Sequence, residues 1–234
     1  MRIYKFTKMR KLILILLSVF GIALTAFAKP VKAEDSPLKF DIVSGKEATV
    51  AGLKNSAMRK TVKSVEIPDE VIVEGKTYKV TSVGMDAFIN CTSLGSVVIP
   101  NSVKSTKTNA FTRCTNLKSV NIPSSVTEIG SGAFVGCTSL ESIEIPNSVT
   151  KIGNGAFRYC TNLKSVNIPN SVTEIGEFAF NDCTSLKSVE IPSSVKSIGV
   201  NAFNLCKSLK SARVPKDCEI YMYAFPNECK VERY

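Results

Sequence analysis

The eight cysteines are the residues whose type and spacing most suggest chemistry. Thiolates that converge in space bind zinc, and suitably placed thiol pairs form disulfides. Cys218 stands alone, whereas the others recur every 23 residues. The regular series is Cys91, Cys114, Cys137, Cys160, Cys183, Cys206 and Cys229. One cysteine per repeat places the thiols in a line and not around a common point, so no metal site is predicted.

The line of cysteines instead predicts a ladder of buried thiols, because a free cysteine packs as a small hydrophobic side chain. Disulfides between neighbouring repeats are the alternative, but parallel side chains would hold the Cβ atoms about 5 Å apart, where a disulfide prefers about 3.8 Å. Cys218 leaves the ladder, and a disulfide with Cys229 or Cys206 stays open for it. Such a link would close a loop of about a dozen residues and stabilise the fold by about 3 kcal/mol.

Carboxylates are the second group that could do chemistry. Glu144 and Glu190 fall two repeats apart, about 9.6 Å if each repeat adds one strand. That separation is close to the one between the two carboxylates of an inverting glycosidase. Asn167 falls between them, however, and nothing in the sequence predicts a pocket. The chain has no histidine, which removes Ser-His-Asp and Cys-His arrangements. We therefore expect no catalytic residues, no cofactor and no enzymatic activity.

The element that carries these residues is a 23-residue repeat, of which residues 114–136 are one copy. Val120 and Ile122 alternate with polar residues, as in a strand with one buried face. Pro123 ends the strand because it has no N–H for a ladder. Val126, Ile129 and the Phe of the Ala-Phe pair turn back inward, which makes the phenylalanine series a core column and not a binding stripe. Gly130 allows a tight bend or a positive φ.

Stacking such repeats predicts an α/β leucine-rich-repeat solenoid. We expect a parallel sheet with one strand per turn and short helical or 3₁₀ turns on the other side. Two alternating runs around Glu74-Gly75-Lys76 predict a hairpin, which with a strand in Phe40–Val50 would form a small N-terminal β cap. Thr106-Lys107 replaces the usual Ile-Gly and predicts a weak spot in the core. The last repeat, with Cys218 in place of valine, looks like a short C-terminal cap.

Along each strand the residue between the two inward ones points to solvent, and a row of serines runs beside it. These outward side chains form an extended polar surface, which we call the sheet face, suited to a large partner. A solvated face without a partner is the alternative. The predicted binding residues are Asn121, Glu144, Asn167, Glu190, Arg213, Ser119, Ser142, Ser165 and Ser188.

The repeat resembles the BspA-like leucine-rich repeats of bacterial surface antigens. The shared pattern is Cys-x-x-Leu-x-x-Val-x-Ile-Pro-x-x-Val-x-x-Ile-Gly-x-x-Ala-Phe, and it covers residues 67–229. Unlike ordinary leucine-rich repeats, the chain has its cysteine before the strand. The resemblance implies a secreted or cell-surface protein that binds other proteins, including host matrix proteins such as fibronectin or fibrinogen. A structural partner for other envelope proteins is the second hypothesis.

The first residues have the order of a secretory signal peptide. Basic residues precede an apolar run that ends near Leu24, and Ala26-Phe27-Ala28 and Val31-Lys32-Ala33 are both candidate cleavage sites. We expect the leader to occupy residues 1–33 and to be removed, leaving no membrane span. Residues 1–33 hold seven of the 30 basic residues and no acidic one, so their loss lowers the net charge from +10 to +3. That balance does not favour nucleic acid as a partner.

The remaining chain is predicted to divide into an N-terminal β cap at 34–66, the solenoid at 67–229 and a tail at 230–234. Its length suits a single domain. We expect a monomer.

Overall fold

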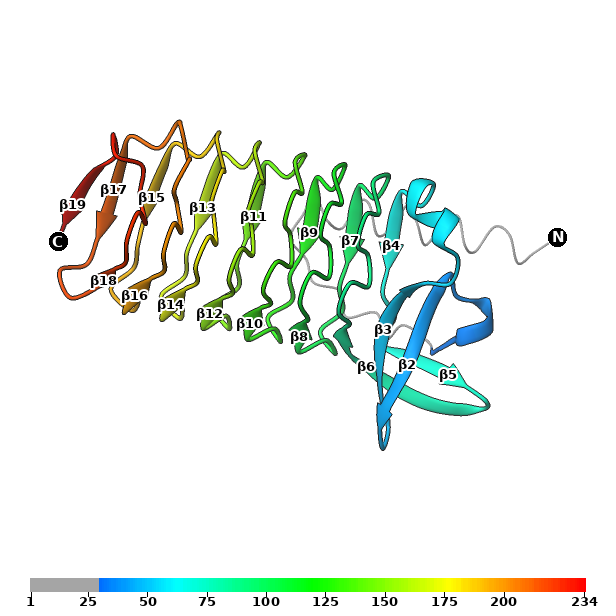
Figure 1. The fold of residues 1–234 in the computed structure, drawn as a ribbon. Helices are drawn as coiled ribbons and strands as arrows, with labels where there is room; N and C mark the ends of the chain where they lie inside the picture. The colour runs from blue at the N-terminus through cyan, green and yellow to red at the C-terminus, as the bar shows by residue number, and fades with distance from the viewer. Residues whose placement is uncertain (1–29) are drawn as a thin grey trace, which may run out of the picture.

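The computed structural model describes residues 30–234, so residues 1–29 of the leader predicted at 1–33 lie outside them. The last residues of that predicted leader are described, and they include β1 (Val31–Lys32), which pairs with Val71 and Ile72. The described chain is a β-solenoid whose turns stack from the N-terminal to the C-terminal end (Figure 1). The predicted repeat solenoid with parallel strands is confirmed. Among residues 30–234, no helix is both long and apolar enough to cross a membrane.

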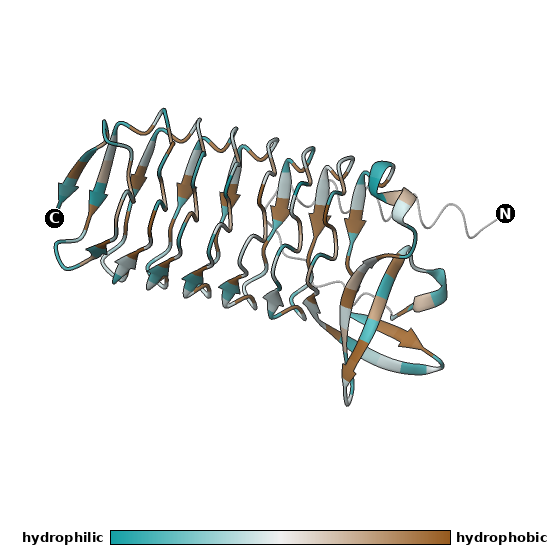
Figure 2. Ribbon diagram, in the orientation of Figure 1, coloured by the Kyte–Doolittle hydropathy of each residue, from teal (hydrophilic) through white to brown (hydrophobic). Residues whose placement is uncertain are grey.

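The longer strands of the turns carry the sheet face. In these strands Val97, Val120 and Ile143 point inward while their neighbours face solvent. Figure 2 shows the resulting alternation of hydrophobic and hydrophilic residues. These strands form three separate parallel sheets, of three, two and three strands, and within each sheet a strand pairs with the equivalent strand of the next turn. Ser96, for example, lies opposite Ser119. They are β4 (Ser64–Glu66), β7 (Ser96–Val98), β9 (Ser119–Asn121), β11 (Ser142–Glu144), β13 (Ser165–Asn167), β15 (Ser188–Glu190), β17 (Ser211–Val214) and β19 (Lys230–Arg233).

A second parallel ladder runs along another side of the stack, so the expectation of one strand per turn is wrong. Its strands are only two residues long, and in β10, β12, β14 and β16 the second residue is a buried isoleucine. Such short strands exist only because the next turn supplies their hydrogen-bond partners. They are β8 (Ser105–Thr106), β10 (Glu128–Ile129), β12 (Lys151–Ile152), β14 (Glu174–Ile175), β16 (Ser197–Ile198) and β18 (Glu219–Ile220).

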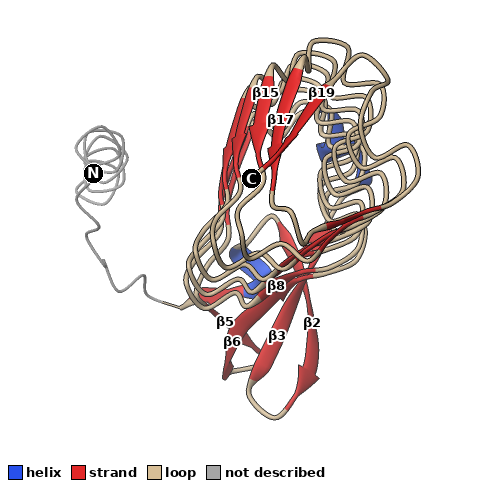
Figure 3. Ribbon diagram, turned by 90° about the vertical axis from the view of Figure 1, so that its left-hand side faces the viewer, coloured by secondary structure: helices blue, strands red, loops and turns tan. Residues whose placement is uncertain are grey.

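The remaining side of each repeat consists of hydrogen-bonded turns, where helical or 3₁₀ turns were expected (Figure 3). The N–H of Cys137 donates to the Phe134 carbonyl, and turns of this kind repeat along the stack. The described chain has only two 3₁₀ helices, η1 (Ala33–Asp35) and η2 (Ser56–Lys60), and both precede the repeats. The turns are tightened by two left-handed residues per repeat, which interrupt any helix. The first of these positions holds Asp86, Asn109, Gly132, Gly155, Phe178, Asn201 and Tyr223, all with φ between 55° and 65°.

Gly130 does not adopt a positive φ, which was one of the two reasons suggested for a glycine at this position. A Cβ at this position would lie 2.4 Å from the Thr106 carbonyl oxygen of the preceding turn. Gly153, one repeat later, approaches the Ile129 carbonyl oxygen in the same way, at 2.7 Å. The glycine therefore lets the backbones of neighbouring turns come together.

A column of stacked phenylalanine rings fills the core, as predicted. Neighbouring ring centroids are 5.1–5.4 Å apart and their planes differ by 2–12°. The column runs from Phe88 to Phe225, even though Phe225 comes one residue early in the sequence. The missing residue is already accounted for in the preceding short strand, where Ile220 pairs with Ile198 only 22 positions earlier. Ring stacking and core burial stabilise the aligned position of Phe225.

The N-terminal end is covered by strands of mixed direction, two of which form the predicted antiparallel hairpin around Glu74-Gly75-Lys76. The predicted strand in Phe40–Val50 is in fact a second hairpin, β2 with β3. The long β6 joins this cap to the short-strand ladder, because it pairs with β3 and β5 and also with β8. The cap strands are β1 (Val31–Lys32), β2 (Leu38–Ser44), β3 (Glu47–Leu53), β5 (Glu70–Val73) and β6 (Lys76–Val83).

Candidate binding face

The sheet face presents all nine predicted binding residues to solvent. Each is exposed, and each lies on a strand from β9 to β17. The parallel register sets Ser142 opposite Ser165 and Glu144 opposite Asn167. Likewise Glu190 lies opposite Arg213. The predicted residues therefore form two straight rows and do not gather around a single point.

Two acidic residues extend the outer row beyond the predicted set. Glu66 lies opposite Val98 at the N-terminal end, and Glu232 lies opposite Arg213 at the C-terminal end. The sequence held a signal for Glu66, which precedes Ile67-Pro68 as Val98 precedes Ile99-Pro100. It held none for Glu232, because no Ile-Pro follows the last strand.

Ion pairs between successive turns neutralise part of the charge on and beside the sheet face. The Arg213 guanidinium lies 2.9 Å from the Glu190 carboxylate and stacks 4.8 Å above the Tyr234 ring. Next to the serine row, Lys164 lies 2.6 Å from Glu141. The hydrogen bond and charge of this lysine hold the pKa of Glu141 below its usual range. These surface pairs fix side-chain positions more than they add stability.

The carboxylates considered for catalysis do not face each other across a cleft. Glu144 and Glu190 are on strands β11 and β15, and Asn167 on β13 lies between them. Glu190 is engaged by Arg213. The arrangement is thus a row of alternating amides and carboxylates, which suits hydrogen bonding to a broad surface.

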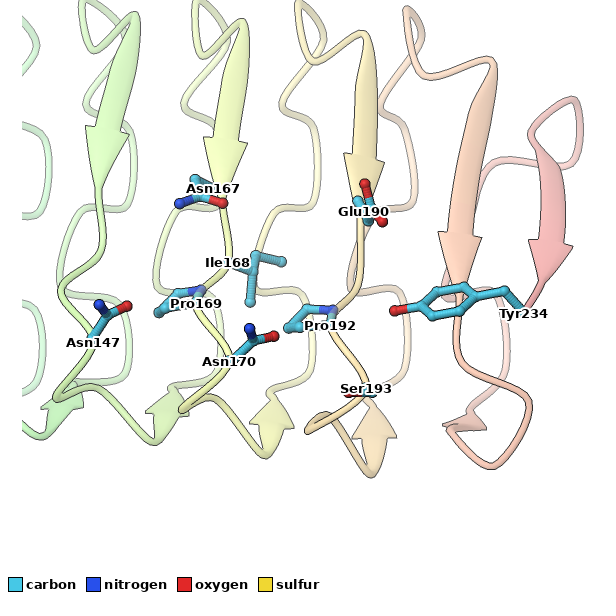
Figure 4. A pocket seen from close by; sticks show the side chains of 9 residues that line it. All are labelled: Asn147, Asn167, Ile168, Pro169, Asn170, Glu190, Pro192, Ser193 and Tyr234. Carbon is cyan, nitrogen blue, oxygen red and sulfur yellow. The ribbon is translucent and has the colours of Figure 1, made fainter.

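A groove of about 340 Å³ lies at one edge of the sheet face, where β13 and β15 end (Figure 4). Asn167 and Glu190 line it on the strand side, and Asn147 and Asn170 line the opposite side. Tyr234 lies across its C-terminal end, where its hydroxyl donates to the Ile191 carbonyl oxygen at 2.7 Å. The sequence did not predict this groove.

The cysteine ladder is buried from Cys91 to Cys206, as predicted, and five of its thiols donate to a backbone carbonyl of the preceding turn. The Cys137 thiol donates to the Phe111 carbonyl of the preceding turn, with Sγ 3.3 Å from the oxygen. Cys114, Cys160, Cys183 and Cys206 repeat this bond at 3.1–3.2 Å. Burial raises the pKa of Cys137 to about 12, so the thiol stays protonated and unreactive.

Every cysteine of the described chain is a free thiol, including Cys218, Cys206 and Cys229. Cys218 is buried and Cys229 is half-buried, and burial raises the pKa of both. Across residues 30–234, no three side chains of the types that bind metals come together.

Aromatic side chains gather outside the sheet face, on the turns. Arg158 stacks on the rings of Tyr159 and Phe178, with its guanidinium 4.6 and 5.0 Å from their centroids. Its Nε donates to Asn181 at 3.3 Å. Tyr221 and Tyr223, nearer the C-terminal end, are exposed.

Comparison with known families identifies the repeat. A family model described as "BspA type Leucine rich repeat region (6 copies)" matches residues 54–155 and 127–234, which together exceed half of the chain. No curated protein matches the chain significantly.

Solved structures of similar chains come from several bacteria. A leucine-rich repeat protein from Bacteroides ovatus is 32% identical, with a TM-score of 0.78 over 85% of this chain. This chain covers 52% of that protein, about half its length. The T. pallidum leucine-rich repeat protein TpLRR is 29% identical, with a TM-score of 0.68 over 87% of this chain and 86% of its own. The pneumococcal vaccine antigen PcpA is 28% identical, with a TM-score of 0.61 over 77% of this chain and 48% of its own. By its repeats and its fold, this chain belongs to the BspA-type leucine-rich-repeat family.

Proposed function

We propose that this chain is an exported binding module that uses its sheet face to contact another protein at the bacterial surface or after secretion. Family membership and the signal-peptide pattern of the first residues support export and protein binding. Host matrix proteins such as fibronectin and fibrinogen are the first candidate partners, as the resemblance to BspA-like surface antigens implies.

The observation that carries the proposal is the recurrence of the sheet face in successive turns. Strands from β4 to β19 present outward side chains at the same place in successive turns, so a partner can contact many turns at once. The residues that vary from turn to turn are polar and charged: Asn121, Glu144, Asn167, Glu190 and Arg213. Rows of this kind suit contact with a broad partner surface.

The second candidate is a partner among the bacterium's own envelope proteins, for which the chain would act as a spacer or assembly element. The same sheet face would mediate this contact. A pull-down by the tagged chain from the producer's envelope, run in parallel with one from host matrix, distinguishes the two partners.

The test is binding of the leader-free chain to immobilised fibronectin, fibrinogen and albumin across a salt series. The sheet-face variant combines Glu144→Ala, Asn167→Ala and Glu190→Ala. A matched control combines Thr127→Ala, Glu128→Ala and Glu177→Ala, which removes the same number of carboxylates from exposed positions outside the sheet face.

We expect saturable binding to a matrix protein, none to albumin, and loss of binding in the sheet-face variant alone. Binding that survives the sheet-face variant would move the contact to the turns, where Tyr159 and Phe178 lie. No binding at micromolar concentration would reject these two matrix proteins, and the envelope pull-down would then decide for or against the second candidate.

A further inference from the structure

The turns that lead into the last four cysteines of the ladder carry large apolar side chains at strained backbone positions. Each turn of the repeat has two left-handed positions, which in the three earlier turns hold only Asp, Asn, Gly and one Arg. In the last four turns these positions also hold bulky residues, with φ between 56° and 62°: Tyr159, Phe178, Leu205 and Tyr223. The left-handed region is unfavourable for a bulky side chain, and Gly or Asn would avoid the strain. The fold itself therefore does not require these residues.

These side chains are also open to solvent. Leu205 is 49% exposed, Tyr223 is 63% exposed, and Met222 beside it is 66% exposed. Tyr159 is exposed as well, and Phe178 is half-buried. We call the surface formed by these five residues the turn face, and it lies on another side of the solenoid from the sheet face (Figure 3). Exposed apolar side chains that gather at positions of backbone strain are typical of an interaction surface.

Large apolar residues alternate with glycine or polar residues along the turn face. At the first left-handed position the four turns hold, in order, Gly155, Phe178, Asn201 and Tyr223. At the position immediately before each ladder cysteine they hold Tyr159, Asp182, Leu205 and Glu228. The large apolar side chains therefore recur in every second turn of each row, and the two rows are out of phase by one turn.

This alternation fits a second copy of the same face in antiparallel orientation. A two-fold axis that crosses the turn face between its second and third turns sets the first turn against the fourth turn of the other copy, and the second against the third. Phe178 would then lie over Asn201 of the partner subunit, and Tyr223 over Gly155 of the partner subunit. The second row would be opposed in the same way. A parallel arrangement would instead set each large side chain against its own equivalent.

The charges on the four turns alternate in the same sense. Arg158 is on the first turn, Asp182 on the second, Lys207 on the third and Glu228 on the fourth. The antiparallel arrangement would set Arg158 against Glu228 of the partner subunit, and Asp182 against Lys207 of the partner subunit. Within the described chain the first three of these residues have no ion pair, and Glu228 has an exposed one with Lys210 at 3.4 Å. Complementary charges of this kind fix orientation and make association depend on salt.

We propose that two copies of this chain pack their turn faces together in antiparallel orientation and form a two-fold dimer. The dimer differs from the monomer expected from the sequence. The sheet face lies on another side of each repeat and stays free in both copies, so the dimer would present two sheet faces to a partner. The inference goes beyond the proposed binding function and does not depend on it.

The test is sedimentation equilibrium of the leader-free chain from about 1 to 100 µM, at low and at high salt. We expect the mass of a dimer at the upper concentrations, and dissociation as salt rises. The interface variant is Phe178→Asn, Tyr223→Asn, which introduces the residue that Asn201 already places at this position of the turn. It should dimerise at least about tenfold more weakly, because four apolar side chains leave the interface.

The matched control is Met85→Asn, Val98→Asn, which removes two exposed apolar side chains outside the turn face. It should dimerise as the wild type does. Circular dichroism verifies that both variants keep the fold.

A charge exchange tests the antiparallel register. Asp182→Arg should weaken dimerisation about tenfold, because an arginine would then face Lys207 of the partner subunit. The backbone accepts arginine at this position of the turn, since Arg113 stands there in an earlier turn with φ of 58°. Adding Lys207→Glu to Asp182→Arg reverses the pair and should restore dimerisation. A variant that is monomeric because it is misfolded would not be rescued in this way.

Three results would overturn the proposal. The first is a monomer mass at 100 µM, which would mean that the turn face meets a different protein. The second is equal weakening in the interface variant and its control, and the third is no rescue by the charge exchange. If the interface variant fails to fold, the charge exchange still decides the question. Matrix-protein binding is measured separately, so a monomer that binds matrix protein rejects only the dimer, and a dimer that does not bind rejects only the matrix partner.

Discussion

Thr106 is a buried polar residue in a ladder of isoleucines, and its replacement tests how the solenoid core is stabilised. It is 4% exposed, and its hydroxyl has no hydrogen-bond partner within the described chain. In the short-strand ladder it lies between Val83 and Ile129. The later turns place isoleucine at this position. The change we consider is Thr106→Val, which exchanges the hydroxyl for a methyl group of similar size.

Leaving a buried hydroxyl without a partner costs about 1–3 kcal/mol, and the valine removes that cost without a change of shape. We therefore expect Thr106→Val to raise the free energy of unfolding by about 1–2 kcal/mol. For a chain of this size each kcal/mol corresponds to a rise in Tm of about 2–4 °C. The valine keeps the β-branched shape that a strand favours, so the backbone should not move.

The assay is urea and thermal unfolding followed by circular dichroism. Thr112→Val is the matched control, because the Thr112 hydroxyl donates to the Gly132 carbonyl at 2.8 Å. We expect the control to lose about 1 kcal/mol, since a made hydrogen bond is removed and the carbonyl is left short of a donor. If Thr106→Val is neutral or destabilising while the fold is retained, the hydroxyl is satisfied in solution and the reasoning is refuted.

Three further predictions concern the core and the turns. Phe157→Ala should lower the free energy of unfolding by about 3–5 kcal/mol in urea titration, because a fully buried ring stacked on both neighbours is lost. The raised pKa of Cys137 means that the folded state holds the thiol proton more tightly than the unfolded chain. Stability should thus be full below pH 9.0 and fall as pH rises toward about 12, and Cys137→Ala should flatten that fall in urea midpoints. Phe178→Gly should raise Tm, because φ is +56° at this residue and the preceding repeat places Gly155 there; an unchanged or lower Tm would show that ring contacts with Arg158 outweigh the strain.

The inward residues could be predicted from the sequence because the repeat has a strict period of 23 residues, which places equivalent residues of successive turns side by side. Each turn meets a copy of itself, so an apolar residue that recurs every 23 positions must lie against its own equivalents. Val126, Ile129 and Phe134 are buried for this reason. The same argument placed the cysteines in a ladder and predicted the outward row of Asn121 and Glu144.

The second ladder could not be predicted from local pattern. Strands of two residues, such as Glu128–Ile129, carry no alternation to recognise, and their hydrogen bonds come from the neighbouring turn. The tight turns, in contrast, could have been predicted from the sequence. Asn, Asp and Gly recur at the two left-handed positions of the repeat, and these residues tolerate positive φ best. That pattern argues for turns and against a helix.

The candidate groove depends on features that no single repeat contains. It exists where Asn147 and Asn170 fall in consecutive turns and where the chain end returns to set Tyr234 beside Ile191. The ion pair of Glu190 with Arg213, at the edge of the groove, also joins two repeats. A sequence read one repeat at a time shows none of these relations.

The solenoid separates the residues that determine the fold from those free to determine binding. Burial against an identical neighbour fixes the inward positions, so the phenylalanines and cysteines recur with little variation from Phe88 to Cys206. The outward positions are exposed, so substitution there costs little stability. Along the sheet face the residues change from Val98 through asparagine and glutamate to Arg213 while the strand geometry stays constant. The proposed choice of partner would therefore depend on which turns carry which outward residue, and the sheet face is one place where this chain differs from a plain repetition of its own unit.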